Sequence, residues 1–499
     1  MFMMRKVTVK DVAEAVKAQF QGENDSEITD VTHDSRQAGT DSLFVAVRGL
    51  SLDGHRFVED VMRRGAVGII SELDKPADFA GVWLKVSDAR TALAQAAATI
   101  YGNPSHDLKL VGITGTNGKT TTTYLIFALC EANGEQSAML TTVEYRIGEN
   151  SEPAIRTTPE ASDTNRFLRR AVEENCQIAV METSSQAIDL HRCDALRFQV
   201  AVFTNLTRDH LDYHLTMENY FTAKRKLFDG SLGEIPKSSV INIDDEYGLK
   251  LAVELKKNNQ KVVTFAQNTT ADLSAENIKV SLIKGTTFTL KTPHGDREII
   301  SPLVGKPHVY NILAATATAL ELDCDLDKIV EGLRICVGAP GRFERVPHDG
   351  DFAVVVDYAH SDDALLNTLK TAKELTNGRI ITVFGCGGDR DKSKRAPMGQ
   401  VAGKYSDLVI VTSDNPRTEN PLRIISEIEK GLQETTCPYQ IIPDRRDAIH
   451  QAIAKAKRED VVLIAGKGHE TYQIVGNDKF HFDDREIARE ALESLKEQS

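Results

Sequence analysis

The sequence lacks several features that mark whole classes of protein. No apolar stretch approaches the ~18 residues that a membrane-spanning helix needs, and no long apolar run follows the first residues as it would in a secretion signal. There is no C-x-x-C pair, and the seven cysteines are scattered. These absences argue against a zinc knuckle and a disulfide framework, so we expect a protein of a reducing compartment, the cytoplasm.

The composition excludes further classes. No internal repeat of solenoid length and no low-complexity tract is present. A net charge of −13 argues against non-specific binding to nucleic acid, although a small pocket can still be locally positive. The 499 residues are too many for one core, and a chain of this length typically forms about three domains.

A glycine-rich stretch at residues 112–120 is the strongest motif. It reads G-I-T-G-T-N-G-K-T and fits the phosphate-binding pattern G-x-x-x-x-G-K-[ST]. The apolar run at 108–111 predicts a buried strand, and residues 121–129 predict a helix. In that setting backbone N–H groups and the helix dipole converge on an anion, Lys119 reaches the outer phosphates and the Thr120 hydroxyl ligates Mg²⁺. An ordinary turn with a surface lysine is the alternative, which these flanks disfavour.

The first 106 residues predict a small α/β domain. A helix is expected over 8–20, and an alanine-rich helix over 91–101. Strand-like runs lie at 28–31, 43–47, 67–70 and 82–86. Two polar segments, 34–36 and 49–55, either hold a polar ligand or are plain surface turns. Gly and Pro at 102–105 mark the first domain boundary.

Residues 107–338 predict a parallel sheet covered by helices, with ligands beyond the carboxyl ends of its strands. The expected strands lie at 178–181, 200–204, 240–243 and 262–265. Glu182 follows the first of them and is either a Mg²⁺ ligand or a solvent-facing strand end. The loop 205–214 holds two histidines and two aspartates, whose spacing matches no zinc motif. His308 and Asn311 either face a nucleotide or, for Asn311, only start a helix.

Lys224 is out of place in its predicted helix. The apolar stripe there consists of Tyr220, Phe221, Leu227 and Phe228, and Lys224 falls within it. An inward lysine is costly unless it is paired or chemically altered. The alternative is a lysine that buries only its stem and keeps the ammonium in water.

Residues 339–499 predict a second α/β unit after a hinge-like stretch at 338–342. Apolar strands at 354–356, 380–384, 408–411 and 461–465 each end in a polar loop. Because such loops meet at one edge of a parallel sheet, we expect them to form a second binding face. Each loop taken singly is as consistent with a structural role as with a functional one.

Together these motifs resemble the Mur ligases, the ATP-dependent amide ligases of peptidoglycan precursor synthesis. The likeness covers essentially the whole chain and rests on T-G-T-N-G-K-T-T at 114–121, Glu182, N-L-T-R-D-H-L-D-Y-H at 205–214, Lys224, Asn311, G-R-F-E at 341–344, D-Y-A-H at 357–360 and G-G-D-R-D at 387–391. D-N-P-R at 414–417 looks like the motif associated with meso-diaminopimelate, and lysine-adding relatives usually lack its arginine.

The resemblance implies an α/β protein of three domains: a small UDP-muramoyl substrate domain over 1–106, a central P-loop ATP domain over 107–338 and a Rossmann-like amino-acid domain over 339–499. It implies that ATP and Mg²⁺ are used to add meso-diaminopimelate to UDP-N-acetylmuramoyl-L-alanyl-D-glutamate through an acyl phosphate. We therefore expect small-molecule substrates, no nucleic acid, no membrane insertion and a monomer.

The resemblance also implies roles for particular residues. ATP would be held by Gly115, Thr116, Asn117, Gly118, Lys119, Thr120, Thr121, Asn311, Arg342 and Asp357. The UDP-muramoyl dipeptide would contact Ser35, Leu50, Ser51, Leu52, Thr157, Thr158, Ser184 and Arg192. Diaminopimelate would contact Arg390, Asp414, Asn415, Pro416, Arg417, Gly466 and Glu470. Catalysis would fall to Lys119, Glu182, His210 and Lys224, and Mg²⁺ would be organised by Thr120, Glu182, His210 and Lys224.

By the same likeness, Lys224 would carry a carbamate, which turns an inward cation into a carboxylate. Two positions depart from the family pattern: Gln186 stands where histidine is common, and Asp362 lies in a segment that lacks a usual proline. The alternatives are the same ligation with L-lysine, another Mur or folylpolyglutamate-type ligase, and a nucleotide-dependent switch protein. A switch leaves the second loop-bearing face and the inward lysine unexplained.

Overall fold

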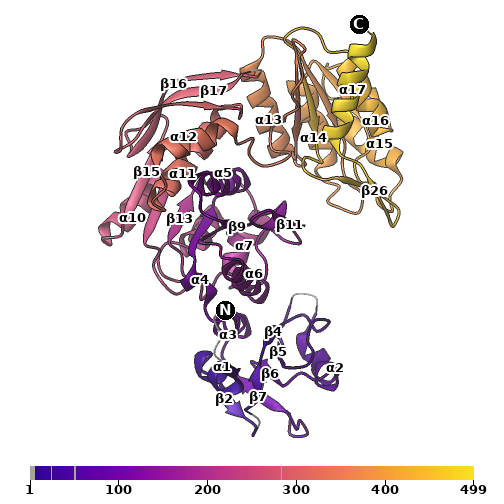
Figure 1. Ribbon diagram of the computed structural model, residues 1–499. Coiled ribbons are helices and arrows are strands. Elements are labelled where there is room, and N and C mark those ends of the chain that lie inside the picture. The colour runs from indigo at the N-terminus through magenta and orange to yellow at the C-terminus, as the bar shows by residue number, and fades with distance from the viewer. Residues whose placement is uncertain (1–5, 24, 50–51, 283, 499) are drawn as a thin grey trace. The chain divides into compact units, whose positions relative to one another are not determined.

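The computed structural model describes residues 6–23, 25–49, 52–282 and 284–498, and these form two compact units. The first comprises Met1–Ser274, Lys291–Gly295 and Tyr310–Gly332, and the second comprises Ala275–Leu290, Asp296–Val309 and Leu333–Ser499. In both, helices lie along the faces of β-sheets (Figure 1). Within the described ranges, no helix is both long and apolar enough to cross a bilayer.

The N-terminal part of the first unit is a five-stranded sheet between helices. Its strand order is β2 (Gln19–Gln21), β7 (Val82–Lys85), β6 (Gly68–Ser71), β5 (Ser42–Val45) and β4 (Asp30–Thr32), with β2 antiparallel to β7 and the others parallel. Helices α1 (Val9–Ala15) and α3 (Ala89–Ile100) share one core with the sheet, and α2 (Val58–Arg63) shares the other. The short elements are β1 (Val7–Thr8), β3 (Glu27–Ile28), η1 (Gly54–Phe57) and α4 (Pro104–Asp107).

The expected helix over 8–20 is wrong beyond Ala15. Lys17 adopts a positive φ of 53°, which ends helical geometry. Phe20 instead pairs with Leu84 in the sheet and packs against the core on that side. Sheet pairing therefore overrides the local helical pattern. The four strands expected in this part are confirmed to within two residues at either end, except that the first is divided between β3 and β4.

The central part of the first unit is a parallel sheet, which confirms the predicted α/β class. Its parallel strands run in the order β9 (Ser137–Leu140), β12 (Ile178–Glu182), β8 (Lys109–Thr114), β13 (Val200–Phe203), β14 (Ser238–Asn242) and β15 (Val262–Ala266). The hairpin β10 (Glu144–Ile147) and β11 (Asn150–Pro153) extends one edge. The helices are α5 (Lys119–Asn133), α6 (Ala161–Glu173), α7 (Ser185–Asp189), α8 (Leu211–His214), α9 (Met217–Arg225) and α10 (Glu246–Lys257).

Three further strands continue this sheet beyond β15. They are β16 (Leu273–Ser281), β17 (Gly285–Lys291) and β18 (Arg297–Ser301), of which β17 and β18 pair antiparallel. Helices α11 (Lys306–Glu321) and α12 (Leu326–Ile335) follow. We did not expect these strands from the sequence, although β17 alternates between buried and partly buried side chains, as a strand covered on one face does.

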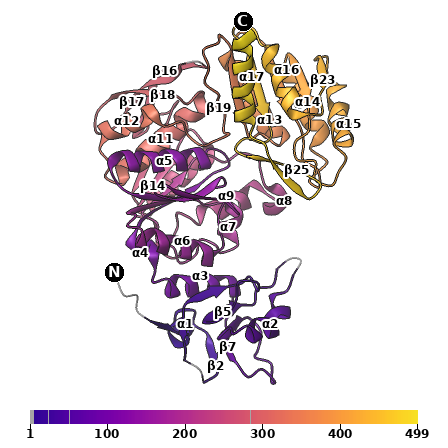
Figure 2. The same ribbon diagram turned by 45° about the vertical axis from the view of Figure 1, so that its right-hand side comes forward.

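The C-terminal part of the second unit is a six-stranded sheet in the order β19 (Glu344–Arg345), β20 (Ala353–Asp357), β24 (Val461–Ala465), β21 (Ile380–Phe384), β22 (Leu408–Val411) and β23 (Tyr439–Ile441). All neighbours are parallel except β19 and β20. Val355 and Leu463 face a core with α13 (Asp362–Leu375), α14 (Arg395–Tyr405) and α15 (Pro421–Leu432). Val354 and Val462 face the opposite core, with α16 (Arg445–Ala454) and α17 (Asp484–Gln498), which lie side by side (Figure 2). A hairpin of β25 (Tyr472–Val475) and β26 (Asp478–His481) precedes α17.

Candidate functional site

The loop between β8 and α5 depends on two glycines. Gly115 has a φ of 151° and Gly118 a φ of 87°, where a side chain would be strained. A Cβ on Gly115 would lie 1.9 Å from Thr204 Oγ1, and one on Gly118 would lie 2.5 Å from Asn311 Oδ1. The loop therefore turns tightly into the amino end of α5, where unpaired N–H groups and the helix dipole favour an anion.

The polar groups of this loop gather at the start of α5, and their predicted roles toward phosphate and Mg²⁺ stay predictions. Lys119 Nζ donates to the carbonyl oxygens of Gly115 and Thr116, each at 2.9 Å, so the ammonium lies over the loop. Thr120 and Thr121 are buried in the first turn of α5. The backbone N–H groups of Thr116 and Asn117 donate to Asn205, at 2.9 Å each, which ties the loop to the end of β13.

Glu182 is a buried carboxylate at the same sheet edge. It ends β12 opposite Ile113 of β8, and its residue is only 1% exposed. Its Oε1 accepts from the N–H of Thr142 at 2.9 Å and from the hydroxyl of Thr142 at 3.2 Å. The solvent-facing alternative for Glu182 is therefore excluded. Among the described residues both side-chain hydrogen bonds end on Oε1, which leaves Oε2 for a cation.

Lys224 points inward and is not snorkelling. It is 1% exposed, its Nζ donates to the Gly115 carbonyl at 2.8 Å, and that nitrogen lies 4.5 Å from the centroid of the Tyr220 ring. Burial, and then the nearby charge of Lys119, hold the pKa of Lys224 well below its usual value. The site therefore favours a neutral amine with a free electron pair.

The histidines of the loop 205–214 have different surroundings. His210 precedes α8 with a φ of 51° and is exposed, and its ring centroid lies 6.0 Å from that of Tyr220, the ring beneath Lys224. His214 is buried, with Nε2 2.9 Å from Ser185 Oγ and its ring stacked on Tyr220 at 5.0 Å. Burial lowers the pKa of His214, so we assign it a packing role as a neutral ring.

Asn311 lies against the glycine loop. It falls inside α11 and not at its start, so the helix-start alternative is wrong. Its Oδ1 accepts from the Thr122 hydroxyl at 3.4 Å and is the atom that a side chain at position 118 would strike. His308 is also buried, and its Nδ1 has no hydrogen-bond partner in the described structure.

The expected dipeptide contacts divide into two groups. Thr158 donates to the Glu182 carbonyl at 2.8 Å and accepts from the Ser184 N–H at 3.1 Å. Arg192 donates to the Thr158 carbonyl at 3.2 Å, and the Thr142 hydroxyl donates to that of Thr157 at 3.1 Å. Four of the eight predicted contacts, Thr157, Thr158, Ser184 and Arg192, thus gather around Glu182.

The other four belong to the N-terminal part. Ser35 lies after β4 and its carbonyl accepts from Arg64. Leu52 is 55% exposed and its carbonyl accepts from the Gly49 N–H at 2.8 Å. Leu50 and Ser51 lie outside the described residues. Within the described part of the chain, no hydrogen bond joins Ser35 or Leu52 to the group around Glu182.

In the second unit, Asp357 is the last residue of β20, at the carboxyl-end edge of the parallel strands. Its carboxylate accepts from the N–H groups of Phe343 and Ala359 at 2.6 and 3.0 Å, and from the Thr368 hydroxyl at 2.9 Å. Burial raises the pKa of Asp357, and this effect outweighs the lowering by the charge of Arg342 and by these hydrogen bonds. The guanidinium of Arg342 lies 4.7 Å from the centroid of the Tyr358 ring, and its buried Nε has no partner among the described residues.

The loops after β21, β22 and β24 meet at the same edge, as expected. Asn415 donates to Glu470 Oε2 at 2.8 Å, and its Oδ1 accepts from the Ile474 N–H at 2.9 Å. Gly466 has a φ of 114°, and a Cβ there would lie 2.8 Å from Asp414 Oδ2. Asp414 and Asn415 are both buried. The sheet edge therefore gathers a compact polar cluster from loops that are distant in sequence.

Arg417 is held beside this cluster by backbone carbonyls. Its Nη1 donates to the Gly388 carbonyl at 2.8 Å, and its φ is 50°. The carbonyl of Pro416 lies so close to Gly388 that a Cβ there would be 1.9 Å away. Arg390 is exposed on the facing loop. The structure thus brings together all seven residues that the resemblance assigned to diaminopimelate.

The sequence reasoning missed Lys467. It is fully buried, and its Nζ donates to Glu470 Oε2 at 3.1 Å and Asn415 Oδ1 at 3.3 Å. Its setting between two glycines in G-K-G-H-E was visible, but not its burial. We infer that Lys467, which is fully buried, neutralises the partly buried carboxylate of Glu470 and fixes its position.

Three protein-family models match successive parts of the chain: "Mur ligase family, catalytic domain" over 27–101, "Mur ligase middle domain" over 113–319 and "Mur ligase, glutamate ligase domain" over 341–468. A relative from Alkaliphilus metalliredigens is 43% identical, with 95% of this chain and 94% of the relative covered. One from Geobacter metallireducens is 46% identical, with 94% and 95% covered. Both are named UDP-N-acetylmuramoyl-L-alanyl-D-glutamate–2,6-diaminopimelate ligase.

The chain belongs to the Mur ligase family. A solved structure of a ligase with the same name is 32% identical, has a TM-score of 0.72 and covers 99% of this chain and 100% of its own. The Mur ligase middle-domain match contains Lys119, Glu182 and Lys224. The predicted three-domain α/β fold is therefore confirmed, while the exact boundaries at 106 and 338 stay predictions.

Proposed function

We propose that this Mur ligase uses ATP to join meso-diaminopimelate to UDP-N-acetylmuramoyl-L-alanyl-D-glutamate, releasing ADP and phosphate. The observation that carries the proposal is the combination, at one sheet edge, of a phosphate-binding loop, the buried Glu182 and the buried Lys224. The names of the relatives, which match along nearly the whole chain, support the choice of substrates.

The proposed reaction has two steps. A free carboxylate oxygen of the D-glutamyl residue attacks the γ-phosphorus of ATP, the bond to ADP breaks, and an acyl phosphate forms. The amine nitrogen of diaminopimelate then attacks the carbonyl carbon, and phosphate leaves with the former carboxylate oxygen. The N–H groups in the first turn of α5 and the ammonium of Lys119 would hold the phosphates and offset their charge as it shifts.

The residues around the loop also fit Mg²⁺, a hard cation that prefers oxygen ligands. Thr120 offers a hydroxyl, Glu182 a carboxylate oxygen and a carbamate on Lys224 two more oxygens, with His210 nearby as a ligand or orienting group. A bound Mg²⁺ would supply positive charge that offsets the negative charge of the transferring phosphoryl group.

Lys224 is suited to carbamate formation because its pKa is lowered by burial. A neutral amine adds CO₂ through its electron pair and loses one proton to solvent, which leaves a carboxylate on nitrogen. The product places negative charge beside Lys119, where two cations would otherwise repel each other. We therefore propose that the working enzyme carries N6-carboxylysine at this position.

We propose that the amino-acid substrate binds to the cluster formed by Asp414, Asn415, Arg417 and Glu470. A guanidinium grips a carboxylate through two parallel hydrogen bonds, and diaminopimelate has a second amino-acid end where lysine has only an ammonium. Arg417 would thus attract the far carboxylate of diaminopimelate and repel the side-chain ammonium of L-lysine. The seven free cysteines and the use of ATP suit a cytoplasmic reaction.

Phosphate release tests the proposal. With ATP, Mg²⁺ and the UDP-muramoyl dipeptide, we expect diaminopimelate to stimulate release much more than L-lysine. Lys119→Met abolishes the stimulation, whereas Lys256→Met, an exposed lysine at the end of α10, leaves it intact. A better response to lysine would change the proposed amino acid only. No response to either amine would refute the ligase.

A further inference from the structure

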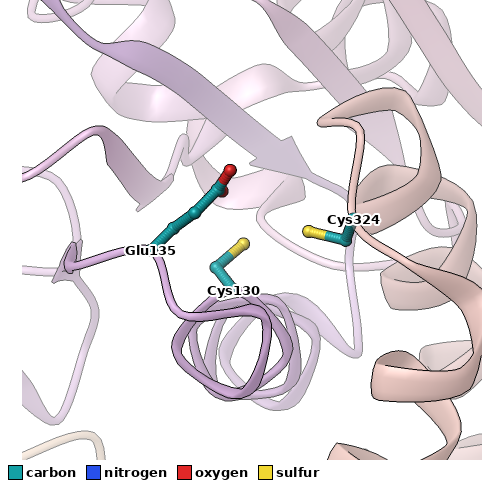
Figure 3. A group of neighbouring side chains, drawn as sticks. All are labelled: Cys130, Glu135 and Cys324. Carbon is teal, nitrogen blue, oxygen red and sulfur yellow. The ribbon is translucent and has the colours of Figure 1, made fainter.

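Two cysteines and a glutamate that the proposed reaction does not use come together in the first unit. Cys130 lies in the last turn of α5, Glu135 just beyond it, and Cys324 just beyond α11. One ligand atom from each lies within 4.8 Å of the other two, and both cysteines are buried (Figure 3). We propose that this group binds one thiophilic divalent cation of the Zn²⁺ class.

The same kind of helix C-terminal cap positions two of the three side chains, Glu135 and Cys324. At the end of α5, Gly134 has a φ of 92° and the Glu135 N–H returns to the Cys130 carbonyl at 3.1 Å. At the end of α11, Asp323 has a φ of 71° and the Cys324 N–H returns to the Ala319 carbonyl at 3.0 Å. These two C-terminal caps turn the chain back over the helix ends, so that Glu135 and Cys324 reach Cys130.

Further contacts fix the two caps relative to each other. The Asp325 N–H donates to Asn133 Oδ1 at 3.1 Å, and Lys328 Nζ donates to the Asn133 carbonyl at 3.1 Å. Gly332 of α12 lets the helix pack closely on α5, since a Cβ there would lie 3.0 Å from Leu129. The three side chains are therefore held by the fold before any cation arrives, which lowers the cost of ordering them on binding.

Two sulfur ligands and one carboxylate favour a thiophilic cation. Two thiolates with one carboxylate suit Zn²⁺, and ligand atoms around a tetrahedral Zn²⁺ lie roughly 3.3–3.8 Å apart when the bonds are about 2.1–2.3 Å long. Glu135 Oε2 is buried and has no hydrogen-bond partner in the described structure.

The site is open, because only three protein ligands converge within the described residues. Glu135 is partly exposed, so water can complete the tetrahedron, as at zinc sites that exchange a ligand. Binding displaces the thiol protons to solvent and should strengthen as pH rises. The cation would join α5, whose other end forms the phosphate-binding turn, to the connection between α11 and α12.

Cadmium is the probe for the first test, because thiolate–cadmium bonds absorb in the ultraviolet. The metal-stripped, full-length chain, kept reduced without added thiol, is titrated with Cd²⁺ in excess Mg²⁺. We expect a thiolate–cadmium band that saturates at one equivalent and is abolished in Cys130→Ser and Cys324→Ser. Cys437→Ser, which removes a cysteine from the second unit, should leave the band unchanged.

A more conservative variant separates the loss of a metal ligand from the loss of the fold. Glu135→Gln keeps both thiolates and the shape of the side chain, and we expect it to bind Cd²⁺ at least tenfold more weakly while keeping the ultraviolet band. Zn²⁺ should compete for the same equivalent and raise the unfolding temperature of the parent chain, but not that of Cys324→Ser. Absence of the band, or equal binding by Cys130→Ser, would overturn the proposal.

Discussion

Lys224 shows how burial decides the chemistry of a single residue. A charged lysine in its position would share the Gly115 carbonyl with Lys119 and have little access to water. The sequence predicted an unusual lysine, because a cation interrupted an apolar helical stripe. It could not predict the shared carbonyl, which lies 109 positions away along the chain.

Removing Lys224 should abolish ligation in a way that a small acid repairs. We expect Lys224→Ala to lose at least a hundredfold in kcat, since the proposed carbamate is lost, and acetate or formate to restore part of the rate. Phosphate release with and without added acid measures this. Lys256→Ala is the control, which should be active and indifferent to acid. Full activity of Lys224→Ala without acid would remove Lys224 from the mechanism.

His308 should make stability depend on pH. Burial lowers the pKa of His308 from 6.5 to about 4, so the unfolded chain binds the proton more tightly than the folded chain. The free energy of unfolding therefore falls as pH drops from above 6.5 toward 4. The loss should be about 2 kcal/mol between pH 7.5 and pH 5. We expect His308→Gln to lose less stability than the parent over this range, measured by urea midpoints. The exposed His294→Gln should follow the parent; identical pH dependence of both variants would contradict the assignment.

At the scale of elements, most strands were predictable and most pairings between distant residues were not. Runs such as Ile380–Phe384 and Val461–Ala465 match the structure at both ends, because apolar strands buried on both faces are unambiguous. The β16–β18 strands lacked such a signal. Asn311 beside Gly118 and Lys467 beside Glu470 arise only when separate elements pack together.

The glycine loop offers a matched pair of substitutions. Gly118→Ala introduces a Cβ 2.5 Å from Asn311 at a positive φ, whereas Gly134→Ala has a similar φ of 92° but meets nothing within 4 Å. We expect Gly118→Ala to weaken ATP binding at least tenfold and Gly134→Ala to cost only about 1 kcal/mol of stability. Calorimetric titration with ATP and thermal unfolding separate the two effects. Equal ATP affinities would show that the loop tolerates a side chain.

The loops of the second unit should determine which amino acid is chosen. Arg417→Lys removes the planar guanidinium that the proposal assigns to the far carboxylate. We expect KM for diaminopimelate to rise tenfold or more, with a smaller effect on kcat and a narrower preference over lysine. Arg423→Lys, at an exposed position of α15, is the control. An unchanged ratio of kcat/KM values for the two amines would show that Arg417 does not read the substrate.

At the scale of the whole molecule, the proposed function assigns a different part of the reaction to each of the two units. The first holds the phosphate-binding loop with Glu182 and Lys224, and the second holds the polar cluster around Asn415 and Glu470. The reaction class and the order of the motifs could be inferred from sequence, because each motif follows a recognisable strand. The contacts of each half depend on packing among residues that are far apart along the chain.

Isotope transfer tests the central claim most directly. The UDP-muramoyl dipeptide is labelled with the heavy isotope of oxygen in the free carboxylates of its D-glutamyl residue, then incubated with ATP, Mg²⁺ and diaminopimelate. Mass spectrometry follows the tripeptide product and the released phosphate. The account predicts one heavy oxygen in each phosphate for each peptide bond formed. Tripeptide accompanied by unlabelled phosphate, or phosphate released without tripeptide, would contradict it.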